Sequence, residues 1–351
     1  MALAPMDLPM FVLSFFIILV SCELFTNGVE WVARRFNLSK GAVGSVLAAV
    51  GTALPETMVP LIAILILPAS SGVGQEIGVG AIMGSPFMIS TLALFVCGLS
   101  LLIFRRRRAS RTLDLDGRLV RRDLSFFLLA YSLAAAAAFL PGEMQWPRYL
   151  LGLGLLLLYG AYIWRTMRQG GGPDEGAEPL YFERSLCFLL GDDGEAEPRT
   201  AIMMGQVLLA IIGIVAGAAI FVDQIREISL AIGVSPLVLS LLIAPMATEL
   251  PEMYNSFTWV RGGKDVYAMG NLTGAMVFQS CIPVTVGLLL TPWHIDIWEP
   301  QQALQAASMA IALLSAAVLY VSASRRSIGL PNLLLGGLLY GAFIGIVLLI
   351  V

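Results

Sequence analysis

Two six-residue stretches place a proline and a glutamate inside segments that are otherwise apolar enough to cross a membrane. They read GTALPE at 51–56 and ATELPE at 247–252. A carboxylate in the middle of a membrane span costs at least ~2.5 kcal/mol on insertion scales, so it indicates a functional residue by default. Because Glu56 and Glu252 recur in the same sequence context, we interpret them as carboxylate ligands of one site.

Each stretch also exposes further oxygen atoms beside its glutamate. Proline lacks an N–H group, so the carbonyls of Gly51 and Ala247 lose their helical partners. In hydrocarbon such carbonyls need another helix, water or an ion. Thr52 and Thr248 lie four residues before the glutamates and share their helix faces. Carboxylate, hydroxyl and carbonyl oxygen atoms are the ligands of a hard cation such as Ca²⁺ or Na⁺, and two carboxylates match the charge of a divalent ion.

A third carboxylate, Glu249, precedes Glu252 by three residues, and its counterpart in the first stretch is Ala53. Residues three apart lie on one face of a helix, so Glu249 is a candidate to line the same site. Buried carboxylates that lie close together disfavour each other's charged form, which makes competition by protons natural.

The composition indicates a polytopic membrane protein. Of its 351 residues 58% are hydrophobic and only 13% are charged, whereas soluble domains average about a quarter charged. Apolar runs of about 20 residues predict transmembrane helices. We expect ten, at roughly 9–33, 42–67, 77–104, 123–140, 148–167, 201–226, 232–258, 266–291, 302–323 and 330–351.

The basic residues predict how these helices are oriented. Ten spans place all of the 21 Lys and Arg residues except Arg148 and Arg226 on one side of the membrane. By the positive-inside rule that side is cytoplasmic, and both termini are outside. We interpret the run RRRR at 105–108 as part of this signal. The expected partners are therefore the lipid bilayer of the cell membrane and inorganic cations, and no nucleic acid.

A polar segment at 168–200, rich in glycine and acid, divides the chain into a five-helix half at 1–167 and a second half at 201–351. Its acidic cluster lacks the ligand spacing of an EF-hand, so we expect a solvated cytoplasmic linker. The matching stretches fall in the second and third helices of each half. Because each half has an odd number of helices, the second repeat must be inverted. The predicted fold is an all-α polytopic membrane protein with two inverted five-helix repeats.

The paired stretches resemble the two alpha-repeat motifs of sodium/calcium exchangers, which usually read G-T-S-L-P-E. That family has ten helices, termini outside, inverted repeats and a cytoplasmic central loop, and the description covers essentially the whole chain. The resemblance implies that Glu56 and Glu252 are the central cation carboxylates. It implies that Thr52 and Thr248 supply hydroxyl and carbonyl oxygen atoms.

The third helix of each repeat departs from the family pattern G-S-N-x-x-N or G-S-N-x-x-D. The counterparts here are GSPFMI at 84–89 and GAMVFQ at 274–279. The resemblance leaves Ser85 and Gln279 as candidate ligands in these helices, whereas Ile89 offers no oxygen. Several oxygen atoms that would complete separate sodium sites are missing.

These observations predict an antiporter that exchanges a divalent cation, with Ca²⁺ as the first choice, for Na⁺ by alternating access. An H⁺-coupled antiporter is the alternative, followed by a channel or a membrane protein that does not transport. An intramembrane enzyme is not expected. The single histidine, His294, and four cysteines without a C-x-x-C pair supply neither a hydrolase motif nor a thiolate or imidazole metal site. We expect no covalently bound cofactor, only the transported Ca²⁺ or other divalent ion and Na⁺ or H⁺.

Overall fold

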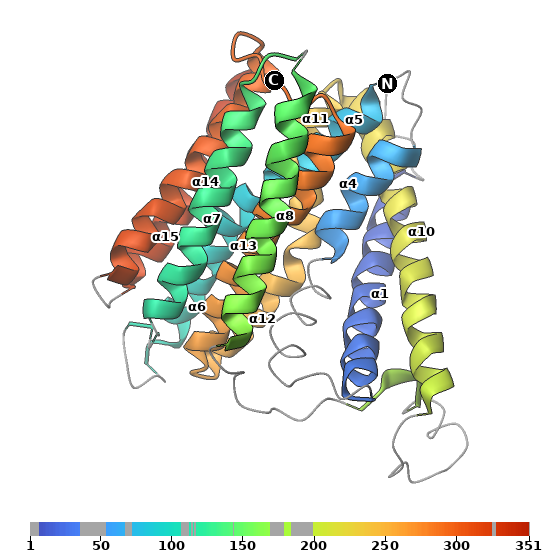
Figure 1. The fold of residues 1–351 in the computed structure, drawn as a ribbon, viewed down its shortest axis with the longest axis vertical. Helices are drawn as coiled ribbons and strands as arrows, with labels where there is room; N and C mark the ends of the chain where they lie inside the picture. Colours follow the sequence, from blue (N-terminus) through green and yellow to red (C-terminus); the bar gives the residue numbers. More distant parts are fainter. Residues whose placement is uncertain are drawn as a thin grey trace.

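In the computed structural model, all regular secondary structure in the described part of the chain is helical. That part comprises residues 7–35, 54–66, 72–106, 112–113, 115, 117–142, 144–168, 179–183, 199–324 and 328–350. Figure 1 shows its helices running side by side along a common direction. They are α1 (Asp7–Arg35), α4 (Leu54–Ile66), α5 (Val73–Met88), the π-helix η3 (Ile89–Ala93), α6 (Leu94–Phe104), α7 (Gly117–Ala138), α8 (Gln145–Arg168), α10 (Thr200–Ile232), α11 (Pro236–Thr248), α12 (Leu250–Arg261), α13 (Asp265–Leu290), α14 (Pro300–Ser324) and α15 (Leu330–Ile350).

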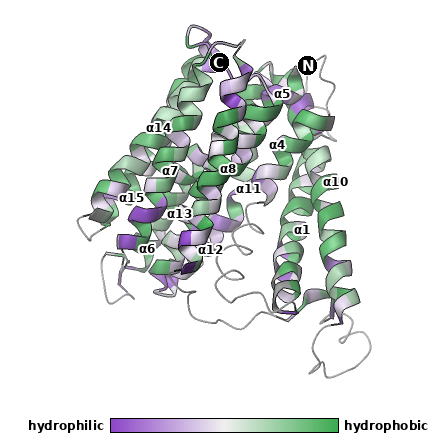
Figure 2. Ribbon diagram, in the orientation of Figure 1, coloured by the Kyte–Doolittle hydropathy of each residue, from purple (hydrophilic) through white to green (hydrophobic). Residues whose placement is uncertain are grey.

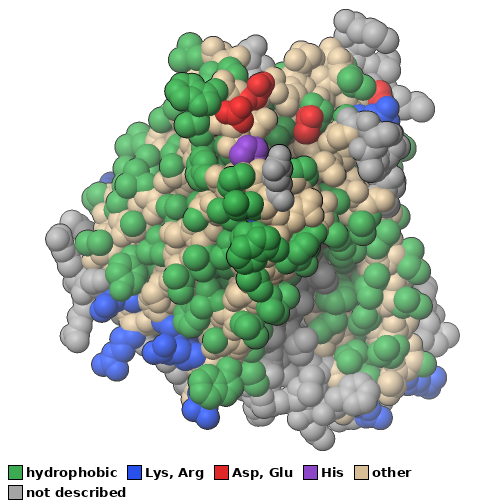
Figure 3. All heavy atoms as spheres, turned by 45° about the horizontal axis from the view of Figure 1, so that its top comes forward, with side chains coloured by type: hydrophobic (Ala, Val, Ile, Leu, Met, Phe, Trp, Pro, Cys, Tyr) green, Lys and Arg blue, Asp and Glu red, His purple; other side chains and the backbone are tan. Residues whose placement is uncertain are grey.

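Seven of the described helical segments are long and apolar enough to cross a membrane, counting the run from α5 to α6 as one. The pair α11 and α12 passes the same test together but is bent by 44°. Apolar residues colour most of the ribbon in Figure 2, and Figure 3 shows a wide hydrophobic surface with charged side chains gathered towards its edges. The chain is therefore a multi-pass membrane protein.

The predicted number of ten spans stays a prediction. Helix α7 begins with several charged residues and is not among the seven apolar segments. Of the second predicted span, 42–67, the structure describes only the part from residue 54, which forms the 13-residue helix α4.

The apolar side chains form two cores that share two helices. The smaller core joins residues of α1, α4, α5, α10 and α11, and the larger joins residues of α5 to α8 and α11 to α15. Helix α1 packs mainly on α10, beside which it lies in Figure 1. Gly213 permits this close approach, because a Cβ atom there would lie 2.2 Å from Oγ of Ser21. Helices α5 and α11 contribute to both cores and therefore connect them.

A short segment of the central linker, residues 179–183, is docked on the pair α1 and α10. Nε2 of Gln206 donates to Oδ1 of Asn27 at 3.0 Å. The side-chain oxygen of Asn27 also accepts a hydrogen bond from the backbone N–H of Tyr181 at 3.1 Å. That of Gln206 accepts one from the backbone N–H of Phe182 at 3.0 Å. The sequence led us to expect a solvated linker, and this part of it is packed instead. Most of the linker, including its acidic cluster, lies outside the described residues.

Glycines set the crossing of α5 and α11. A Cβ atom on Gly80 would lie 2.5 Å from the carbonyl oxygen of Leu237, and one on Gly84 would lie 2.2 Å from that of Leu241. The four-residue spacing of these glycines is the small-residue pattern that lets membrane helices approach closely. The crossing fixes α11, and with it the bend that follows at residue 249.

Replacing Gly84 by alanine should destabilise the protein. The new Cβ atom would meet backbone, and overpacking of this kind costs about 1–3 kcal/mol. Gly154→Ala in α8 is the matched control, because nothing lies within 4 Å of a Cβ atom there and alanine favours a helix by about 0.5–1 kcal/mol. The thermal midpoints of the purified proteins in detergent measure the difference. A Gly84→Ala midpoint equal to that of Gly154→Ala would contradict the close crossing.

Candidate cation site

The two glutamates predicted as ligands each lie in the first turn of a helix. Helix α4 begins with Leu-Pro-Glu and carries Glu56, and α12 begins with the same three residues and carries Glu252. Proline is favoured in a first turn because its fixed φ suits the helix and its missing N–H has no intrahelical partner there. The positive end of the helix dipole also favours a carboxylate at this position.

The break predicted at the second stretch is present in the structure. Helix α11 ends at Thr248, α12 begins at Leu250, and the two are bent by 44°. Glu249 lies at the bend, with φ −84° and ψ −4°, and is the residue that both helices share as a cap. At the first stretch Gly51, Thr52 and Ala53 lie outside the described residues.

The fold brings three carboxylates together. One oxygen atom each from Glu56, Glu249 and Glu252 lie within 4.8 Å of one another. Their residues are 2%, 0% and 0% exposed. Two unit charges at this distance repel by roughly 3 kcal/mol at an effective dielectric constant of about 20. The cluster is therefore suited to bind positive charge.

Buried oxygen atoms around this cluster lack hydrogen-bond donors. Nε2 of Gln279, on α13, donates to Oε1 of Glu249 at 2.6 Å. Among the described residues no donor reaches either carboxylate oxygen of Glu56, Oε2 of Glu249 or Oε1 of Gln279. Buried acceptors are nearly always paired in proteins. Such oxygen atoms offer lone pairs that suit a cation.

The remaining predicted ligands differ in how they are placed. Thr248 is buried, and its hydroxyl donates within its own helix to the carbonyl of Pro245 at 3.5 Å. Ala247 lies in the last turn of α11, beside the bend. Ser85 is buried in α5.

The π-helix η3 falls at the position that corresponds to Gln279 in the first half. It begins at Ile89, which is fully buried and apolar. The hydroxyls of Ser90 and Thr91 donate to the carbonyl of Phe87 at 3.1 and 2.5 Å. The hydroxyls thus donate to a backbone carbonyl where the wider π-turn interrupts the hydrogen-bond ladder of the α-helix. The two halves therefore differ here, since α13 continues as a regular helix and presents Gln279.

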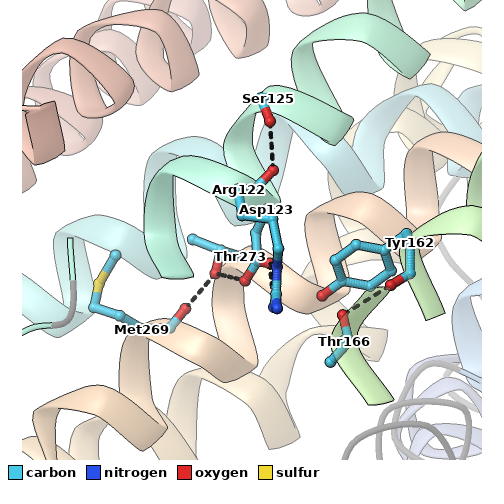
Figure 4. Close-up of polar contacts among 7 residues, drawn as sticks. All are labelled: Arg122, Asp123, Ser125, Tyr162, Thr166, Met269 and Thr273. Carbon is cyan, nitrogen blue, oxygen red and sulfur yellow. Dashed lines mark hydrogen bonds and ion pairs between the residues drawn. The ribbon is translucent and has the colours of Figure 1, made fainter. Parts of the chain in front are cut away.

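A second buried carboxylate site, centred on Asp123, was missed by our reading of the sequence. Arg122 pairs with Oδ1 of Asp123 at 2.8 Å, and the hydroxyl of Thr273 donates to Oδ2 at 2.8 Å. Figure 4 shows this cluster, with Tyr162 beside it. The guanidinium of Arg122 lies 5.5 Å from the ring centroid of Tyr162. The cluster joins α7, α8 and α13. The sequence feature that could have indicated this site is a single aspartate directly after Arg121 and Arg122. We interpreted these basic residues only as evidence of membrane orientation.

Removing the carboxylate of Asp123 should destabilise the protein strongly. The side chain of Arg122 is only 9% exposed and would lose its ion pair with Asp123, and breaking a buried pair from one side costs about 3–5 kcal/mol. Asp223→Ala is the control, because its pair with Arg226 is exposed and such pairs contribute at most about 1 kcal/mol. Thermal midpoints should fall clearly for Asp123→Ala and little for Asp223→Ala. Equal midpoints would show that the buried cluster does not stabilise the helices.

Comparison with known proteins gives matches along nearly the whole chain. The family model described as sodium/calcium exchanger protein matches residues 7–168 and 202–351. An uncharacterized membrane protein of Methanocaldococcus jannaschii is 23% identical over 324 residues, which cover 91% of this chain and 90% of that protein.

Two solved structures are also similar. The crystal structure of the H⁺/Ca²⁺ exchanger CAX is 17% identical with a TM-score of 0.73, and the match covers 97% of this chain and 82% of that one. A structure of the sodium-calcium exchanger NCX_Mj is 22% identical with a TM-score of 0.58, covering 97% and 98%. At these identities the structural matches show a shared fold.

Proposed function

Because the chain belongs to the sodium/calcium exchanger protein family, we propose that it is a secondary active antiporter that exchanges Ca²⁺ or another divalent cation for Na⁺. The observation that carries the proposal is the cluster of buried carboxylates at the starts of α4 and α12. A divalent ion at this cluster would offset two negative charges that the apolar surroundings do not solvate. All-oxygen ligands of this kind suit Ca²⁺.

In this proposal Glu56 and Glu252 are the ligands that bind the divalent ion. Thr52, Thr248 and Ser85 supply hydroxyl oxygen atoms, and the carbonyls of Gly51 and Ala247 complete the coordination as the ion is enclosed. Glu56 is 2% exposed, and no hydrogen-bond donor among the described residues reaches its carboxylate oxygen atoms, which supports the proposal. Leaving them unmatched would be costly in an apolar interior.

The topology is part of the same proposal. We take residues 1–167 and 201–351 as inverted five-helix repeats that make ten spans, with both termini outside and the linker at 168–200 in the cytoplasm. The pairing of α1 with α10 supports it, since these are the first helices of the two halves. So does the meeting of Glu56 with Glu252, because a pseudo-two-fold axis at the midplane brings equivalent breaks together. Alternating access would then expose the one site to each side in turn.

The counter-ion has a second candidate, H⁺. Three carboxylates within 4.8 Å favour uptake of protons once the divalent ion leaves. The solved exchangers that share the fold are an H⁺/Ca²⁺ exchanger and a sodium-calcium exchanger. We retain Na⁺ as the proposed counter-ion and make H⁺ an outcome of the test.

Ion flux in proteoliposomes tests this function. We expect an outward Na⁺ gradient to drive accumulation of Ca²⁺ against its own gradient, which a channel cannot do. Glu56→Gln and Glu252→Gln should each abolish accumulation while the purified protein stays folded, because each removes a ligand charge. Glu227→Gln, an exposed glutamate of α10 that lies outside the cluster, should transport normally.

Other outcomes separate the alternatives. Accumulation driven by a pH gradient and unaffected by Na⁺ would assign H⁺ as the counter-ion. Flux that only equilibrates Ca²⁺ would indicate a channel. Full accumulation by both glutamine variants would contradict the site.

A further inference from the structure

The carboxylate of Glu249 has no equivalent in the first half of the chain, where the matching residue is Ala53. It lies at the bend between α11 and α12, is 0% exposed, and has one oxygen atom within 4.8 Å of those of Glu56 and Glu252. The cluster is therefore asymmetric. One half contributes a single carboxylate and the other contributes two.

A purely structural role for Glu249 does not account for its hydrogen bonds. Gln279 donates to Oε1 of Glu249 at 2.6 Å, which satisfies one acceptor. Oε2 of Glu249 and Oε1 of Gln279 remain buried, with no donor in the described chain. A structural contact that leaves two acceptors unmatched would be destabilising. Both atoms lie on side chains that meet at the cluster, where a cation would satisfy them.

We propose that Glu249, positioned by Gln279, is a third carboxylate ligand that makes the site discriminate between divalent and monovalent cations. This inference rests on the proposed function, namely that Glu56 and Glu252 bind the transported divalent ion. It adds a ligand, a positioning residue and a basis for selectivity. Gln279 holds one oxygen atom of Glu249, so the other is oriented before the ion arrives.

The selectivity follows from how electrostatic energy depends on charge. The attraction between two ions is proportional to the product of their charges, so a carboxylate attracts a divalent ion twice as strongly as a monovalent ion at the same distance. Removing one carboxylate should therefore change the logarithm of Ca²⁺ affinity about twice as much as the logarithm of Na⁺ affinity, counted per Na⁺ bound. Loss of a ligand that serves only as a neutral oxygen donor would not produce this ratio.

Equilibrium binding to the full-length protein in detergent tests the proposal, with Ca²⁺ and Na⁺ as the probes in direct and competition titrations. We expect Glu249→Gln to lower Ca²⁺ affinity by a factor that is about the square of its effect on each Na⁺. Gln279→Leu removes both the donor and the amide oxygen of Gln279 but keeps the carboxylate of Glu249. It should weaken Ca²⁺ binding by roughly ten- to a hundredfold, as loss of a ligand's supporting hydrogen bond does at metal sites.

Controls keep the result interpretable. Glu249→Asp retains the charge and should keep a Ca²⁺-to-Na⁺ ratio nearer to the unmodified protein than Glu249→Gln does. Glu227→Gln removes one exposed charge outside the cluster and should leave both affinities unchanged. If Glu249→Gln does not fold, Gln279→Leu decides the question, because the proposal predicts that the folded variant binds Ca²⁺ more weakly and an unchanged Ca²⁺ affinity would contradict it.

The outcomes also separate this inference from the proposed function. If Glu249→Gln changes neither affinity, or changes both by the same factor, while Glu56→Gln abolishes Ca²⁺ binding, then the third-ligand role is wrong and the exchange site stands. If Glu56→Gln and Glu252→Gln also bind Ca²⁺ normally, then the proposed function itself is wrong.

Discussion

Burying three carboxylates in an apolar helical bundle is the constraint on which the rest of the structure depends. Glu56, Glu249 and Glu252 come within 4.8 Å of one another and are almost entirely shielded from water. Two features of the protein offset part of their repulsion, namely the helix N-termini of α4 and α12 and the amide of Gln279. These partial charges do not balance three ionised carboxylates, and the proposed cation would supply the missing positive charge.

The surrounding helices are arranged so that this cluster can form. Close packing at Gly80 and Gly84 seats α11 against α5 and so places the bend at Glu249. Helix α13 presents Gln279 to the cluster, and its earlier turns are tied to α7 through Thr273 and Asp123. The cluster also lies where the two apolar cores meet, since α4 belongs to the smaller core and α12 and α13 to the larger.

The sequence was informative where the chemistry is local and repeated. Glu56 and Glu252 were predictable because a carboxylate and a proline recur in apolar segments, and Glu249 because it lies three residues from Glu252. Gln279 came only from the family resemblance, since nothing near it in the sequence indicates a carboxylate thirty positions away.

Other features depend on contacts that only the folded chain creates. Asp123 adjoins Arg122 in a run that reads as an interfacial charge cluster, and its burial results from packing against α13. The docking of residues 179–183 requires Asn27 and Gln206, which are far apart in the sequence. The polar composition of the linker therefore gave no sign of it. No recognisable sequence pattern indicates the π-helix that begins at Ile89.

The central claim is that Glu56 and Glu252, from two different helix starts, bind one divalent ion. Structure determination with Sr²⁺ tests it most directly, because Sr²⁺ resembles Ca²⁺ and its anomalous scattering locates the ion. We predict one peak shared by both carboxylates, at separations near the 2.3–2.6 Å that are typical of Ca²⁺–oxygen bonds or slightly longer. A saturated sample with the ion bound elsewhere, and no peak between these two glutamates, would contradict the account.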